Sequence, residues 1–452
     1  MAHVFISFLG IGGFDKKPGY DKAEYIWPEK TQKSITCCFA QTAILAAMEA
    51  CETQRSTVDR VVLFCTRESY DKHLNLLTDE FKHHLKHEPE IITPALVPTD
   101  MTADNQWGWF EQLLDNVGFG DRLVMDFTHG MRAVPIIFSS AIGFLTRAKN
   151  ITLEHALYAW YDQNRQDGDP HPIVDMKDFY VINDWAESVS RLTEDADARK
   201  LGEMAKQSRV DALAPLADEN LVAAFQEMTD CIRNVDVNNV SQKVNAALAY
   251  VENSRKKAVG SAQLMLDLVW EKFCALATDY PPSGRYDQPY FETQIKIIEV
   301  LMEHRLFMQA FTVMREVIGA IGMAGVGGKY AQKNMSSGDG RKYRKRFAEV
   351  FVNMMQFPEN EWKFSEFAEE SRLKLMPWFK KLQQAGIEPK LREIVDEMVK
   401  IRNGFDHAWT SEKTASPEIE QKGEQYLKQL QEIIGKMADR SCFQRRKTRQ
   451  PE

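Results

Sequence analysis

The sequence predicts two architectures in one chain: an α/β N-terminal part with a Rossmann-like, doubly wound parallel sheet, and an all-α C-terminal half. The first is predicted because short apolar runs alternate with helical patterns up to about residue 185. The second is predicted because apolar residues recur only at helical spacing from Asp184 onward. A chain of 452 residues exceeds one ordinary core, so we expect two or three domains.

The α/β part is justified element by element by its apolar runs. The first run is followed by a polar loop over residues 14–34, and the first helix is expected over 35–50. The expected strands cover residues 4–9, 61–66, 91–97, 123–126 and 151–160. The remaining helices are expected at 70–85, 107–117 and 133–146.

Three loops are candidates for ligand binding, because ligands of such sheets lie beyond the carboxyl ends of the strands. They cover residues 10–13, 66–69 and 128–132. A dinucleotide fingerprint fails at the first loop, since its third glycine would fall on Asp15. A phosphate-binding P-loop fails as well, because Lys329 precedes Tyr330 and follows a helix. The sheet therefore binds a phosphate-bearing ligand in another way.

The loop after the fourth strand carries the motif Asp126-Phe127-Thr128-His129-Gly130. Thr128 supplies a hydroxyl, and Gly130 permits close approach of the backbone to a ligand. The next helix begins nearby, and its N-terminus favours an anion with which Arg132 can pair. The alternative is that Thr128 caps this helix while His129 is solvated.

This motif resembles the D-x-T-H-G motif of the CRISPR-associated proteins with a CARF sensor domain. The run Ser7-Phe8-Leu9-Gly10 resembles the first strand and loop of that family, and residues 156–161 and 172–185 are similar to its domain end. The resemblance implies that residues 1–185 form a sensor that dimerises and binds a cyclic oligoadenylate, with a ring of four adenylates expected and six as the alternative. The residues implied to contact the ring are Thr128, His129, Gly130 and Arg132, with Gly10, Gly12, Thr66 and Ser69 lining the neighbouring loops.

The C-terminal half divides into a helical connector over residues 186–255 and an all-helical domain over 256–452. Helices are expected at 185–192, 201–205, 221–232, 240–251, 262–277, 294–306 and 311–322. The Gly- and Lys/Arg-rich stretch 325–346 is either a solvated surface loop or a mobile basic edge that holds single-stranded RNA. In the second case Tyr330 or Tyr343 stacks on a base.

A further candidate site is the hexapeptide Arg402-Asn403-Gly404-Phe405-Asp406-His407, which ends a helix with a buried apolar stripe. Arg402 and His407 lie about 140° apart on a straight helix, so acting together requires the helix to end or bend, for which Gly404 is suited. Asn403 lies one turn before His407 and can hold its ring. The alternative is an arginine–aspartate pair beside a surface histidine.

The hexapeptide resembles the R-x4-6-H motif of the HEPN family. The resemblance implies a metal-independent endoribonuclease for single-stranded RNA that acts in type III CRISPR antiviral defence and combines the motifs of two subunits. Arg402 would stabilise charge on the phosphate, His407 would move a proton, and Asn403 would orient either. Two alternatives stay open: a ligand-gated regulator that binds nucleic acid without cutting it, and a sensor that degrades its own cyclic ligand.

Composition limits the remaining choices. A net charge of -8 argues against bulk capture of nucleic acid, so any RNA site is a local basic patch. Seven cysteines without a C-x-x-C pair favour a reducing compartment, and no metal site or cofactor is expected. The sequence shows neither a signal peptide nor a long apolar run, so we expect a cytoplasmic homodimer or higher oligomer with no membrane partner.

Overall fold

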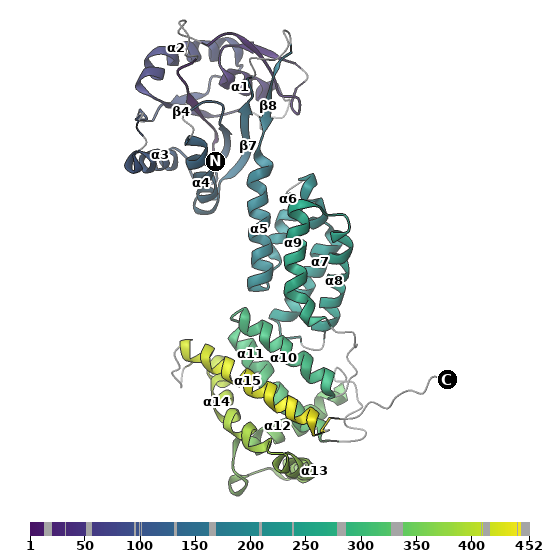
Figure 1. The fold of residues 1–452 in the computed structure, drawn as a ribbon. Coiled ribbons are helices and arrows are strands. Elements are labelled where there is room, and N and C mark those ends of the chain that lie inside the picture. Colours follow the sequence, from purple (N-terminus) through teal and green to yellow (C-terminus); the bar gives the residue numbers. More distant parts are fainter. Residues whose placement is uncertain are drawn as a thin grey trace, which may run out of the picture. The chain divides into compact units, whose positions relative to one another are not determined.

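The computed structural model describes most of the chain in two compact units, Met1–Asn183 and Asp184–Glu452 (Figure 1). Their boundary falls inside helix α5, Lys177–Asp195. The described residues are 1–12, 20–31, 33–50, 57–94, 96–98, 100, 102–130, 133–161, 169–207, 210–236, 239–277, 286–326, 338–407, 409, 416–440 and 442–443, with the backbone alone at 207, 338–343, 345, 416 and 417.

The strands described in the N-terminal unit form one sheet with the order β3-β2-β8-β7-β6-β1-β4-β5. The central run from β7 to β5 is parallel throughout, which confirms the predicted fold class. β8 is antiparallel to β7 and β3 to β2, whereas β2 is parallel to β8, so one edge of the sheet is mixed. The strands are β1 His3–Leu9, β2 Ala23–Ile26, β3 Ile35–Cys37, β4 Arg60–Cys65, β5 Glu90–Ile92, β6 Arg122–Asp126, β7 Thr152–Ala159 and β8 His171–Asp175.

The mixed edge corrects two predictions. Residues 14–34 were expected to be a loop, yet the part described after residue 19 contains β2. Residues 35–37 were expected to begin a helix, yet they form β3, and helix α1 spans Ala40–Ala50. Strands of three or four residues are too short to show an alternating pattern. The sheet recruits them by burying Tyr25 and Cys37 against its core.

Helices cover both faces of the sheet, as a doubly wound fold requires (Figure 1). α1 and α2, Arg67–His84, share one apolar cluster, and α3, Ala103–Asp115, and α4, Val134–Ala148, share the other. Strand β1 is buried along its whole length, because its alternate side chains enter opposite clusters. Phe5 and Leu9 join the first cluster, and Val4, Ile6 and Phe8 join the second.

The strand order reverses beside β1. From β1 the chain continues to β4 and β5 on one side, whereas β6 and β7 lie on the other. The loops that leave β1 and β6 therefore diverge at the carboxyl edge, and a crevice for a ligand is expected between them, because such sheets bind ligands at this point. The residues 10–12 and 126–130 flank this crevice, and the loop after β4 lies next to it.

The second unit is helical in its described part. α8 packs on α7 and α9, while α11 packs on α10, α12, α14 and α15 (Figure 1). No described helix is long and apolar enough to cross a membrane. The division at 255/256 stays a prediction. The elements after α5 are α6 Arg199–Gln207, η1 Asp211–Leu216, α7 Glu219–Arg233, α8 Val240–Arg255, α9 Gly260–Phe273, η2 Cys274–Leu276, α10 Gln288–Glu303, α11 Phe307–Ala324, α12 Gly338–Gln356, η4 Glu359–Glu361, α13 Glu366–Gln384, α14 Glu388–Asp406 and α15 Ser416–Asp439.

The basic stretch 325–346 is not a loop throughout. Its second part, from Gly338, belongs to α12, in which lysine and arginine, both good helix formers, follow Gly340. Arg344 pairs with Glu316, and Arg346 pairs with Glu370, so these two cations are fixed to neighbouring helices rather than forming a mobile edge. Tyr330 lies outside the described residues, and the side chain of Tyr343 is not described.

Candidate functional site

The loop after β6 is held by the buried carboxylate of Asp126. Oδ2 accepts the hydroxyl of Ser7 at 2.7 Å, and Oδ1 accepts the amide of Thr128 at 2.9 Å. The Thr128 hydroxyl donates to Oδ1 as well and accepts the amide of Ala159 at 2.9 Å. The motif thus ties β6 to β1 and β7. Sequence reasoning missed Gln41, which donates to Ser7 Oγ at 3.2 Å and completes this network.

These bonds exclude one of the two interpretations of Thr128. The N-cap of α4 is Ala133, and no side chain caps this helix, so the prediction that Thr128 caps it is wrong. The Thr128 hydroxyl is already engaged by two partners within the loop. Thr128 therefore positions the loop, and its direct contact with a ligand stays a prediction. Arg132 lies outside the described residues.

His129 is half-buried with its Nε2 shielded from solvent, so it is not the fully solvated side chain of the alternative interpretation. Burial lowers the pKa of His129 below its usual value, and the nearby carboxylate of Asp126 opposes the shift. Its Nε2 is buried without a hydrogen-bond partner among the described residues. The ring lies edge-on to Tyr20, with ring centres 5.2 Å apart. A neutral imidazole with an unused nitrogen thus borders the crevice.

Tyr20 and His73 are site residues that the sequence did not indicate. His73 on α2 is 2% exposed and donates from Nε2 to the carbonyl of Ile11 at 2.8 Å, which fixes the loop after β1. The ring of Tyr20 packs edge-on against the ring of His73, with ring centres 5.2 Å apart. The backbone amides of Gly10 and Gly12 lie near the buried hydroxyl of Tyr20 but do not have the geometry of hydrogen bonds. Tyr20 and His73 come from separate segments of the chain, so no local sequence motif contains both.

Steric constraints explain why the loops of the crevice contain glycine at three positions. A Cβ on Gly10 would lie 2.8 Å from the Tyr20 hydroxyl. Gly12 and Gly130 have φ values of 85° and 121°, which side chains rarely adopt. Gly130 is exposed, so its backbone is open to a ligand.

Thr66 and Ser69 form the capping box of α2. The Thr66 hydroxyl accepts the amide of Ser69 at 3.2 Å, and the Ser69 hydroxyl accepts the amide of Thr66 at 3.0 Å. Ser69 is fully buried. Both residues therefore shape the helix start beside the crevice, and their predicted ligand contacts stay predictions. Arg67, which follows Thr66 in the sequence and begins α2, has an exposed side chain.

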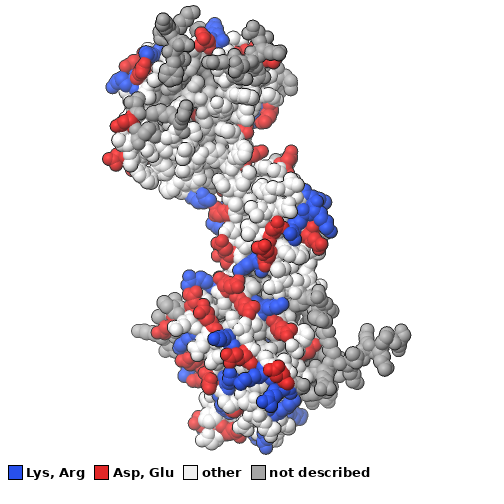
Figure 2. Space-filling view, viewed as in Figure 1, with Lys and Arg blue, Asp and Glu red and all other residues white. Residues whose placement is uncertain are grey.

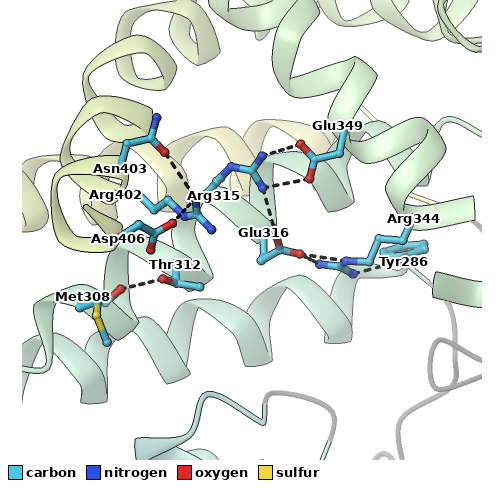
Figure 3. A network of polar contacts seen from close by, with 10 residues as sticks. All are labelled: Tyr286, Met308, Thr312, Arg315, Glu316, Arg344, Glu349, Arg402, Asn403 and Asp406. Atoms are coloured by element: carbon cyan, nitrogen blue, oxygen red, sulfur yellow. Dashed lines mark hydrogen bonds and ion pairs between the residues drawn. The ribbon is translucent and has the colours of Figure 1, made fainter. Parts of the chain in front are cut away.

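The hexapeptide of the second unit lies where α14 ends. Asp406 is the last helical residue and His407 is the C-cap, whose amide donates to the carbonyl of Asn403 at 2.9 Å. Arg402 Nη1 donates to Asn403 Oδ1 at 3.3 Å and forms an ion pair with Asp406 (Figure 3). Asn403 thus contacts Arg402 through its side chain and His407 through its backbone. The arginine–aspartate pair of the alternative interpretation is also present.

Gly404 is required by a contact that the sequence did not reveal. A Cβ on Gly404 would lie within 2.5 to 2.8 Å of three ring atoms of Trp409. Trp409 has a φ of 57°, and its amide donates to the carbonyl of Gly404 at 2.8 Å, so the chain folds back over the helix end. Its ring packs edge-on against Phe405, with centres 5.2 Å apart. This turn fixes the helix end that carries His407.

Helices α11 and α12, which pack on α14, carry further charged pairs (Figure 3). Arg315 pairs with Glu349 at 2.6 Å and Glu316 at 3.3 Å, and Glu316 also pairs with Arg344. Cationic and anionic side chains likewise alternate over the face of this unit seen in Figure 2. The described groups also contain no set of three His, Cys, Asp or Glu side chains that could hold a metal.

Comparison with known proteins gives limited matches. No protein-family model matches the chain. Over 125 residues it is 26% identical to the CRISPR-associated protein MJ1674 of Methanocaldococcus jannaschii, a match that covers 24% of this chain and 20% of that protein. The chain thus spans about a fifth of the length of this curated relative. Csm6 of Enterococcus italicus, solved bound to cyclic hexa-2'-fluoro-hexa-dAMP, aligns over 97% of this chain and 95% of its own, with a TM-score of 0.45 and 10% identity.

Proposed function

We propose that this protein is a cyclic-oligoadenylate-activated, metal-independent endoribonuclease of type III CRISPR defence. The observation that carries the proposal is the place of its two motifs. The D-x-T-H-G loop borders the crevice where the strand order reverses, and the R-x4-H residues lie at the end of a helix. Similarity to a CRISPR-associated protein over part of the chain supports the biological setting.

The chemistry needs three groups at the RNA phosphate. The 2′-oxygen of the substrate attacks phosphorus, its proton is taken up, and the 5′-oxygen leaves with a proton, so a 2′,3′-cyclic phosphate remains. His407 is the proton carrier, and Arg402 neutralises the charge that grows on the phosphate oxygens. Asn403 orients both, through its contacts with the Arg402 guanidinium and the His407 amide.

Activation follows from binding a ring in the sensor crevice of a dimer. An exposed apolar group on the first unit supports pairing of two copies: Trp107 on α3 is 64% exposed, and Ile136 and Phe144 on α4 are 70% and 49% exposed. The ring, four adenylates or alternatively six, stabilises one arrangement of the sensor pair. The connector 186–255 transmits this preference to the two catalytic helices.

The decisive experiment measures cleavage of single-stranded RNA with a panel of cyclic oligoadenylates. We expect cleavage with one ring size, in EDTA, with 2′,3′-cyclic phosphate ends and no cleavage of DNA. Arg402→Ala or His407→Ala should lower the rate by about a hundredfold or more while ring affinity stays unchanged. Lys390→Ala, which removes another paired cation of α14, is the matched control and should cut normally.

Two outcomes would contradict the proposal. Wild-type rates in Arg402→Ala would remove the nuclease assignment, and indifference to every ring would remove the sensor assignment. RNA binding without cleavage would favour the regulator instead.

A second candidate activity is degradation of the ring by the sensor itself. It is favoured by the unpartnered buried atoms of Tyr20, His73 and His129 beside the crevice. Ring consumption by the His407→Ala protein would establish it, because that variant lacks the nuclease's proton carrier. An intact ring after long incubation would exclude it.

A further inference from the structure

Asp406 forms an ion pair with Arg402, the cation that the proposed reaction needs. Its carboxylate pairs with the Arg402 guanidinium, and both side chains are about one-third exposed, at 37% and 32%. The pair is therefore open to solvent and to a substrate phosphate. Arg402 Nη1 also donates to Asn403, so this end of the guanidinium is filled by two protein acceptors.

Helix stability does not account for an aspartate at this position. Asp406 is the last residue of α14, where the helix dipole disfavours negative charge, and the last turn holds no basic residue. Its pair also runs from arginine to aspartate along the helix, which is the weaker order for residues four apart. Asp396 and Lys400 form an ion pair in the favoured order on the same helix. The Asp406 carboxylate therefore acts mainly on Arg402.

The other two arginines drawn in Figure 3 are less accessible to a phosphate than Arg402. Each arginine drawn in Figure 3 is paired with a carboxylate: Arg402 with Asp406, Arg315 with Glu349 and Glu316, and Arg344 with Glu316. Arg315 and Arg344 are less exposed than Arg402, at 17% and 25% against 32%. Arg402 is therefore the most accessible of these three arginines, and its Nη1 becomes free for a phosphate only when the carboxylate of Asp406 leaves.

We propose that Asp406 is a counter-ion that the RNA phosphate displaces from Arg402, and that it thereby sets the affinity of the site for RNA. This inference rests on the proposed nuclease function. One negative charge replaces another on the guanidinium, so Arg402 stays neutralised with or without substrate. Asp406 is a positioning residue, since it acts through Arg402 and not on the reacting atoms. Its charge weakens RNA binding and leaves the chemical step unchanged.

The test compares Asp406→Asn with Asp406→Glu and with the control Asp396→Asn in the full-length protein. Asparagine keeps the shape and removes the charge, whereas glutamate keeps the charge. With the activating ring, Asp406→Asn should lower KM for single-stranded RNA by about two- to fivefold at unchanged kcat, which is the range of an exposed ion pair. The same factor should appear in the Kd for RNA in a His407→Ala background and should shrink at high salt. Asp406→Glu and Asp396→Asn should retain wild-type values.

The outcomes separate this inference from the function on which it rests. If wild-type protein neither binds nor cuts RNA with any ring, the proposed function fails. If wild-type protein cuts RNA but Asp406→Asn has an unchanged or higher KM, the displacement idea is overturned. A lower kcat with unchanged KM would also overturn it, because that result means that the carboxylate holds Arg402 in its working position. An equally large fall of KM in Asp396→Asn would also overturn it, because the effect would then come from the net charge of the protein and not from the Arg402–Asp406 pair.

Discussion

The glycines of α11 set the distance between α11 and α12, and Gly322→Ala measures how closely the two helices pack. A Cβ on Gly322 would lie 2.5 Å from Cβ and 2.4 Å from Cγ of Phe351, which is fully buried. Carbon atoms need about 3.5 Å, so α12 must retreat by about 1 Å. Such overpacking costs about 1–3 kcal/mol, against a gain of about 1 kcal/mol from replacing a helical glycine by alanine. We expect a net loss of up to about 2 kcal/mol.

Gly435→Ala is the matched control in the same unit. Gly435 lies in α15 with no atom within 4 Å of its ideal Cβ, so alanine should stabilise the unit by about 0.5–1 kcal/mol. Because the chain has two units, a single global unfolding curve is unsuitable, and hydrogen exchange of the α11 amides reports the correct transition. The reasoning is refuted if Gly322→Ala protects these amides as well as Gly435→Ala does.

Three further predictions concern the sites. The unfolded chain binds a proton that the half-buried His129 resists, so the stability of the first unit should rise with pH between the lowered pKa and about 6.5. His129→Asn should flatten this rise in a pH series of melts that follow the unfolding transition of the first unit alone, and an unchanged slope would contradict it. Arg132→Ala should raise the ring concentration for half-maximal cleavage by about ten- to a hundredfold with full activity at saturation, and a wild-type response would refute the phosphate contact. Gly404→Ala should displace Trp409 and lower kcat by about a hundredfold at unchanged ring affinity, and normal kcat would show that this turn does not position His407.

The central parallel strands were predictable because β1, β4 and β6 consist mostly of apolar residues. The mixed edge was not, since β2 and β3 have four and three residues and depend on the sheet they join. The basic run at 341–346 was misassigned for a related reason. Its composition suits a surface loop, yet its helix is stabilised by ion pairs such as Arg344 with Glu316, which no local pattern reveals.

The same distinction applies within the sensor crevice. Asp126, Thr128 and Gly130 could be located from the sequence because they are adjacent, and their hydrogen bonds and φ angle act within one loop. Tyr20 and His73 belong to two different segments, and only the folded sheet brings both beneath the loop after β1. A local motif identifies the loop that faces a ligand, whereas the side chains that support it follow from the tertiary structure.

For the hexapeptide, the sequence left a catalytic site and a structural ion pair as alternatives, and the structure makes them compatible. The Arg402–Asp406 pair is partly exposed, and such a pair contributes only about 0–1 kcal/mol. A phosphate can offer the guanidinium two charge-assisted hydrogen bonds, each stronger than a neutral one. Exchange of the aspartate for the phosphate is therefore inexpensive. An arginine that is paired at rest can still serve the reaction, provided that its partner is a neighbour it can release.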